Sequence, residues 1–240
     1  MKTFRGDYEK FLSKVKNNEN FSLSRWGDGE LTILENKKID LRFMKNGEFR
    51  YDPSMLELQK HRQLLQDAYV YKDSGYYIGI ACQCCVGYTK YMYMKQLSGQ
   101  DEEHLTWANI FVNSNYSLFI STFLPEMKNH KSVIVVNKKS NPNLLPFTPE
   151  KVFYVGTDAW VEDIGLIEEL KTYIQTNDIK NHVFLVAAGP FANILTHQLW
   201  MTNKDNIYID IGSTLDRFLG LPLTRDYQIG LADINKVCIW

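Results

Sequence analysis

Two carboxylates separated by one glycine follow a short apolar run near the start of the chain. The run at 21–25 is typical of a strand; it ends at Arg25, and Asp28 and Glu30 come directly after it. Proteins usually hold Mg²⁺ or Mn²⁺ with one or two carboxylates and the phosphates of a substrate. The spacing therefore predicts a divalent metal at Asp28 and Glu30, bound against a phosphorylated ligand. An alternative stays open, because Asp-Gly is a common turn and acids in a first helical turn stabilise the helix dipole.

A second segment suited to phosphate lies near residue 190. The apolar run at 182–187 leads into Gly189 and Pro190, and helical spacing begins at once. Proline suits the first helical position, and glycine lets the backbone approach a ligand closely. The N–H groups of such a first turn bind phosphate with the helix dipole behind them. We expect a phosphate-binding turn at these two residues, the alternative being a plain strand-to-helix turn.

A third segment places an acid inside an apolar run. Asp210 ends the run at 206–210, where an ionised side chain is costly unless a metal, a helix N-terminus or an arginine compensates it. Gly212 and Ser213 follow as backbone and hydroxyl donors, and Arg225 is a candidate charge partner for a phosphate. The alternative is an aspartate that caps a neighbouring loop.

Strands and helices alternate along the chain. Apolar runs typical of buried strands stand at 21–25, 76–81, 132–136, 151–155, 182–187 and 206–210. Helical spacing occurs at 8–15, from about 29, and at 54–70, 102–112, 160–176 and 191–201. This order predicts an α/β, Rossmann-like fold, with a mostly parallel sheet and helices on both faces. Ligands of such sheets bind at the carboxyl ends of the strands, where the three segments fall.

Length and composition predict a single domain over residues 1–240. Hydrophobic residues make up 45% of the chain, which is enough for a sizeable core. A net charge of −1 gives no electrostatic reason to expect nucleic acid as a partner. No apolar run approaches the roughly 20 residues of a membrane span, and the first residues lack the apolar core of a signal peptide. We therefore expect a cytoplasmic protein.

The four cysteines are Cys82, Cys84, Cys85 and Cys238. The C-x-C-C spacing of the first three matches neither a zinc knuckle nor a redox C-x-x-C motif. We expect small buried thiols at the end of a core strand, in a reducing setting.

Taken together, the three segments resemble the GT-D-fold glycosyltransferases, a bacterial and viral family first classed as uncharacterised domains. Arg25-Trp-Gly-Asp-Gly-Glu30 matches the family's R-[FYW]-G-D-G-E, which contains its D-x-E motif. Gly189-Pro-x-Ala192 matches a G-P-x-A turn, and Ile209-Asp-Ile-Gly212 matches a D-x-G strand end. The first motif is fairly specific, whereas the other two are weak alone. The resemblance implies a GT-D-type version of the Rossmann-like fold.

The resemblance implies a metal-dependent glycosyltransferase of cell-surface or protein-linked glycan synthesis. Its donor would be a nucleotide-sugar, a UDP- or GDP-sugar, and its acceptor a glycan hydroxyl. Carried over by position, Asp28 and Glu30 serve the metal, Mn²⁺ or Mg²⁺, and the donor diphosphate. Some members have histidine after the D-x-G glycine, where this chain has Ser213. This departure suggests a different branch, with a different sugar or acceptor.

Asp28, Glu30 and Asp210 are the expected catalytic residues. The residues expected to bind the donor are Arg25, Gly27, Gly29, Gly189, Pro190, Asn193, Gly212, Ser213 and Arg225. Asp28, Asp210 and Asp216 all stay as candidates for the base that the acceptor hydroxyl needs. Two other functions remain open: a metal-dependent phosphoesterase or nucleotide hydrolase, and a non-catalytic nucleotide-binding module.

Overall fold

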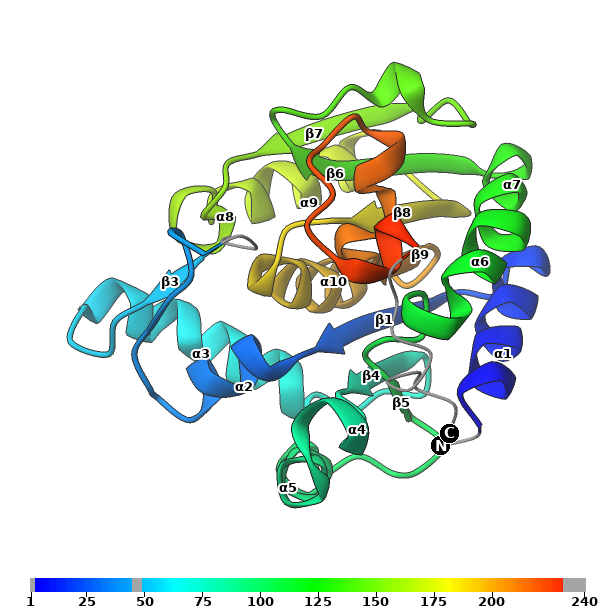
Figure 1. Ribbon diagram of the computed structural model, residues 1–240. Helices are drawn as coiled ribbons and strands as arrows, with labels where there is room; N and C mark the ends of the chain where they lie inside the picture. The colour runs from blue at the N-terminus through cyan, green and yellow to red at the C-terminus, as the bar shows by residue number, and fades with distance from the viewer. Residues whose placement is uncertain (1–2, 45–48, 231–240) are drawn as a thin grey trace.

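A sheet of seven parallel strands runs through the molecule (Figure 1). The computed structural model describes residues 3–44 and 49–230. Within them the strand order is β5-β4-β1-β9-β8-β6-β7, and every neighbouring pair is parallel. The strands are β1 Phe21–Trp26, β4 Tyr76–Ile80, β5 Leu105–Trp107, β6 Lys131–Asn137, β7 Lys151–Val155, β8 His182–Val186 and β9 Ile207–Asp210. The predicted α/β, Rossmann-like fold is confirmed.

The order of the strands reverses beside β1. From β1 the chain moves outward through β4 to β5, crosses to β6 and β7, and returns through β8 to β9, which pairs with β1. Ligands of open α/β sheets bind outside the carboxyl ends of the strands, and we refer to the carboxyl ends of β1 and β9 as the crevice. Arg25 lies near the end of β1 and Asp210 ends β9, so two of the three predicted segments meet at this crevice.

Helices pack on both faces of the sheet. The longer ones are α1 Phe4–Lys16, α2 Asp28–Leu34, α3 Leu56–Val70, α5 Tyr88–Ser98, α9 Leu166–Thr176 and α10 Pro190–Thr202. The shorter ones are α4 Gln83–Val86, α6 Tyr116–Leu118, α7 Leu124–Glu126 and α8 Ala159–Glu162, with 3₁₀ or π turns at Asn113–Asn115 (η1), Phe119–Phe123 (η2), Met127–Asn129 (η3), Pro142–Leu144 (η4), Gly212–Phe218 (η5) and Asp226–Ile229 (η6). A hairpin of β2 Ile39–Asp40 and β3 Arg50–Tyr51 stands apart from the main sheet.

Alternating strand residues build two apolar cores. In β6, Val133 and Val135 join the core under α3, α9 and α10, whereas Ile134 and Val136 join the core under α1, α6 and α7. This alternation follows from the two-residue period of a strand. None of the helices in the described ranges is long and apolar enough to cross a membrane.

Two of the predicted helices are wrong in part. The helix expected at 102–112 is replaced by the edge strand β5, in which Leu105, Thr106 and Trp107 are all buried. Pairing with β4 decides this segment, because its apolar spacing suits a short strand as well as a helix. The helix expected at 160–176 is two helices, α8 and α9, interrupted near Gly165. Glycine weakens a continuous helix at that point.

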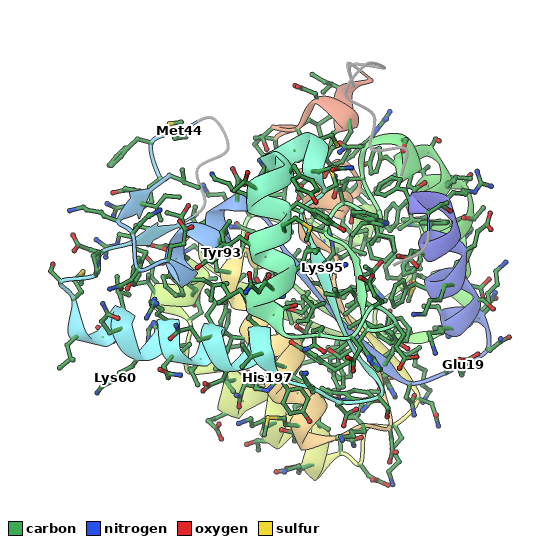
Figure 2. All side chains as sticks on the ribbon, turned by 90° about the horizontal axis from the view of Figure 1, so that it is seen from below. Glu19, Met44, Lys60, Tyr93, Lys95 and His197 are labelled. Atoms are coloured by element: carbon green, nitrogen blue, oxygen red, sulfur yellow. The ribbon has the colours of Figure 1, made fainter. Side chains whose placement is uncertain are left out.

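His197 lies on the buried α10, beside the C-terminal end of α3 (Figure 2). Its ring packs edge-on against Tyr71, with centroids 4.7 Å apart, and lies 5.9 Å from the ring of Tyr76. Burial lowers the pKa of His197 to about 4. The charge of Asp67 raises this pKa, and the charge of Lys171 lowers it further. The imidazole is therefore neutral in the folded protein at neutral pH.

This burial predicts a loss of stability in acid. Between pH 6.5 and about pH 4 the unfolded state binds a proton at His197 that the folded state does not. The free energy of unfolding should therefore fall as the pH is lowered through this window, by up to about 3 kcal/mol. Urea unfolding at pH 7 and pH 4.5 measures the fall, which should be smaller in His197→Gln. The same fall in both proteins would contradict the assignment.

Candidate active site between β1 and β9

Arg25 places a positive charge at the crevice between β1 and β9. Its Nε donates to the carbonyl of Ala108, just beyond β5, and its Nη1 donates to the carbonyl of Asp210 at 3.4 Å. The guanidinium carbon lies 5.8 Å from the centre of the Phe111 ring. These contacts hold the side chain between three strands, so its position depends on the fold and not on a loop.

Asp210 joins the ends of β1 and β9. Its side chain is 6% exposed, and its carboxylate accepts the N–H of Arg25 at 3.1 Å and the N–H of Gly212 at 3.0 Å. Two backbone donors compensate much of the cost of burying an ionised group. The bond to Gly212 caps the loop after β9, which is the alternative that the sequence left open for this acid. Asp210 therefore acts on the site by positioning Arg25.

Gly212 is required by the packing around Arg25. Its φ is +54°, a conformation that side chains disfavour. A Cβ there would lie 2.9 Å from Nη1 of Arg25. The glycine predicted to bind the donor thus has an observed function in packing, because it lets the guanidinium group lie directly against the backbone.

Glu30 caps α2, the helix in whose first turn it lies. One of its carboxylate oxygens accepts the N–H of Gly27 at 2.8 Å. Burial raises its pKa to about 7; two backbone hydrogen bonds oppose this rise, and the charges of Asp210 and Asp28 add to it. Because like charges disfavour ionisation, Asp28 and Asp210 favour the protonated form of Glu30. The capping role considered for the acidic pair is thus observed for Glu30, while Asp28 is exposed at the start of α2.

The carboxylates fit a divalent metal only with help from a ligand. In the described part of the chain, Asp28, Glu30 and Asp210 do not form a group whose oxygens all lie within 4.8 Å of one another. Both oxygens of Asp210 already accept N–H bonds. Asp28 and Glu30 would therefore be the hard oxygen ligands that Mg²⁺ and Mn²⁺ prefer, and phosphate oxygens would have to complete the coordination.

The start of α10 lies beside the same crevice. Gly189 adopts a φ of +55° and Pro190 is the first helical residue, as the sequence predicted. Asn193 is not placed as expected, because it is fully buried and cannot line a donor pocket. Its amide donates to the carbonyl of Arg25 at 2.7 Å and to the hydroxyl of Ser24 at 3.0 Å. The fourth residue of the helix faces β1, so Asn193 fastens α10 to that strand.

Gly29 also has a packing function. A Cβ at this position would lie 2.7 Å from the ring of Phe49, so the glycine gives that ring room against α2. Gly27 keeps its N–H near the crevice, where it binds Glu30. These contacts do not show whether the backbone of Gly27 or Gly29 binds the sugar donor. The predicted role of both glycines in donor binding stays a prediction.

The segment after β9 brings a tyrosine that sequence reasoning missed. Tyr227 shares a hydrogen bond of 2.8 Å with Ser213, and its ring lies 4.7 Å from that of Tyr116. Burial raises its pKa, whereas the charges of Arg25 and Arg225 lower it, so both guanidinium groups act on this hydroxyl. No motif or spacing in the sequence identifies Tyr227 as a site residue. Its place at the site depends on the 3₁₀ turn in which it lies.

Asp216 is held by the same segment. Gln228 donates from its side-chain amide to the carboxylate of Asp216 at 3.2 Å and to the carbonyl of Ser213 at 2.6 Å. These bonds close the 3₁₀ turns η5 and η6 onto each other. Ser213 and Arg225, both predicted to bind the donor, therefore lie in a segment that packs against the crevice.

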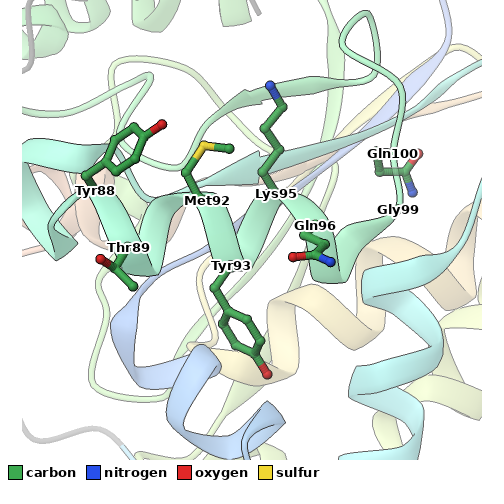
Figure 3. A pocket seen from close by; sticks show the side chains of 8 residues that line it. All are labelled: Tyr88, Thr89, Met92, Tyr93, Lys95, Gln96, Gly99 and Gln100. Atoms are coloured by element: carbon green, nitrogen blue, oxygen red, sulfur yellow. The ribbon is translucent and has the colours of Figure 1, made fainter.

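A surface hollow of about 760 Å³ extends along α5 (Figure 3). It is lined by side chains that include Tyr88, Met92, Tyr93 and Lys95, and none of the predicted site residues is among its lining. The two tyrosines are 65% and 41% exposed. Because α5 follows β4, the strand next to β1, the hollow is on the β4 side of the crevice.

No protein-family model and no curated protein matches the sequence. Three solved structures are similar, each over 94% of this chain. A selenomethionine-substituted form of domain of unknown function 1792 has a TM-score of 0.61 at 15% identity, over 81% of its length. A second, described as having a distinct glycosyltransferase fold, has a TM-score of 0.58 at 15% identity, over 81% of its length. A glycosyltransferase of this domain type from Streptococcus sanguinis has a TM-score of 0.57 at 13% identity, over 85% of its length.

The chain has the fold of these domains. The GT-D-type fold implied by the first motif is therefore confirmed.

The packing of Gly212 predicts the effect of a single methyl group. Gly212→Ala should lower the free energy of unfolding by more than the roughly 1–2 kcal/mol that a positive φ costs alanine, because its Cβ meets Arg25. Gly99→Ala is the matched control, since Gly99 has a φ of +61° and its nearest neighbour atom lies 3.9 Å away. Urea unfolding of both variants measures the difference. Equal losses would show that Arg25 moves aside freely.

Proposed function

We propose that this chain is a metal-dependent glycosyltransferase that moves a sugar from a nucleoside-diphosphate donor to a glycan hydroxyl. One observation carries the proposal: Asp28, Glu30, Arg25 and the start of α10 gather at a single crevice in a sheet with a glycosyltransferase fold. The crevice lies at the carboxyl ends of parallel strands, where ligands of open α/β sheets bind.

The chemistry of transfer requires positive potential at the diphosphate. Negative charge develops on the leaving group as the glycosidic bond breaks, and fixed donors that face this charge lower the barrier most. Arg25 is held in place by Ala108 and Asp210, and the first turn of α10 offers N–H groups. A divalent ion at Asp28 and Glu30 would neutralise the diphosphate when bound.

The contacts of the three candidate bases separate them. The carboxylates of Asp210 and Asp216 both accept N–H bonds from other parts of the protein, which hold these side chains in place. Asp28 is exposed at the crevice. Of the three, we therefore assign the contact with substrate or metal to Asp28, and positioning roles to the other two.

The hollow along α5 supports a place for the acceptor. Tyrosine presents a flat apolar face with a polar tip, which suits a sugar ring, and Tyr88 and Tyr93 are both exposed there. The hollow lies on the β4 side of the crevice, away from the start of α10 that would hold the diphosphate. A glycan bound along α5 would approach the donor sugar from the opposite side.

The proposal predicts a loss of transfer when either acid loses its charge. Asp28→Asn and Glu30→Gln should each lower the rate at least about 100-fold. Each change weakens the binding of the divalent ion that would neutralise the leaving diphosphate. Glutamine keeps an oxygen that can accept the Gly27 N–H, so the helix cap is retained. The assay is the release of nucleoside diphosphate from a panel of UDP- and GDP-sugars, with Mn²⁺ and oligosaccharide acceptors.

Glu57→Gln is the matched control, since Glu57 is an exposed acid in the first turn of α3. It removes the same charge from the same kind of helix position and should leave the rate unchanged. Excess EDTA should abolish transfer, and Mn²⁺ should restore it. Full activity in EDTA would contradict the metal role. Equal release of sugar without an acceptor would indicate a hydrolase, and stabilisation by a nucleoside diphosphate without turnover would indicate a binding module.

A further inference from the structure

Three thiols gather at the carboxyl end of β4. Cys82 follows this strand and is fully buried, whereas Cys84 and Cys85 lie in the short helix α4 and are exposed. The expectation that all three are buried is therefore wrong for the last two. The chain turns sharply after Cys82, so side chains that are neighbours in sequence converge instead of pointing apart.

The group lies one strand away from the carboxylates. Ile80 and Trp26, the last residues of β4 and β1, are paired in register. Cys82 and Asp28 each come two residues later, at the same edge of the sheet. Figure 1 shows α4 next to β4 at the opposite side of β1 from β9.

The distances suit a single metal ion. Sγ of Cys82 lies 2.8 Å from Sγ of Cys84 and 3.4 Å from Sγ of Cys85, and all three sulfurs lie within 4.8 Å of one another. A Zn–S bond of about 2.3 Å places the sulfurs of a tetrahedral site about 3.8 Å apart. Movements of about 1 Å, available to two exposed side chains, bring the group to that geometry.

The surroundings favour sulfur ligands. The amide of the buried Asn109 donates to Sγ of Cys82 and to Sγ of Cys85, both at 3.5 Å. Donors of this kind compensate the charge of thiolates and orient them. Phe4 and Trp107 pack around Cys82 on its buried side. In the described residues this is the one group of three or more potential metal ligands so closely spaced, and it contains no carboxylate.

We propose that Cys82, Cys84 and Cys85 bind one thiophilic cation, Zn²⁺, as thiolates, with Asn109 as the hydrogen-bond donor that orients them. Soft thiolates select Zn²⁺ over Mg²⁺ or Mn²⁺, so this site does not compete for the cation proposed at Asp28. The three thiols release three protons on binding, and no electron is transferred.

Cd²⁺ titration of the reduced, chelator-treated full chain tests the proposal, since Cd²⁺–thiolate bonds absorb in the ultraviolet. The band should saturate at one equivalent, and it should also appear when Cd²⁺ displaces one equivalent of Zn²⁺ bound beforehand, because thiolates bind the softer Cd²⁺ more tightly. Cys84→Ser and Cys85→Ser should each lose the saturating band, and Asn109→Ala should weaken binding about 10- to 100-fold. Cys238→Ser, outside the described residues, is the matched thiol control and should keep the band.

Two results would overturn the proposal. One is a band that persists in the Cys84→Ser/Cys85→Ser double variant. The other is the absence of a saturating band when one equivalent of Cd²⁺ is added to the reduced, unsubstituted chain. The readout does not depend on catalysis. Asp28→Asn should keep the band, so failure of the transferase proposal and failure of this one are distinguishable.

Discussion

The buried carboxylate of Asp210 holds together the two strands between which the site is built. It accepts one N–H from β1 and one from the loop after β9, so each strand end is fixed by the same charge. Arg25 then lies over this junction, and Gly212 gives it room. An acid buried at this depth is stable only while both donors are present, which couples the shape of the crevice to the pairing of the strands.

The electrostatics of the crevice follow from that arrangement. Asp28 and Glu30 extend the acidic character of the β9 end, and burial with like charges keeps a proton on Glu30 to about pH 7. Arg25 lies beside these acids and balances part of their charge.

Neighbouring strands offer ligands of opposite chemical character at one edge of the sheet. Oxygen ligands follow β1 and sulfur ligands follow β4, two residues after a pair of residues in register. Hard cations prefer the first and soft cations the second. If both proposals hold, the side chains that follow adjacent strands would bind two different kinds of ion at one edge of the sheet.

Local patterns in the sequence determined six of the seven strands of the main sheet, most of the longer helices and the acidic motif of Arg25 to Glu30, because hydrophobic period and turn chemistry act over a few residues. Only the tertiary structure decided which side chains face the crevice. Asn193 was expected to line the ligand pocket, but its side chain is buried against β1. Tyr227 and the thiols after β4 reach this edge of the sheet although no motif in the sequence predicts it. Burial and contact across the sheet depend on packing between segments far apart in the chain, and spacing within one segment does not record that packing.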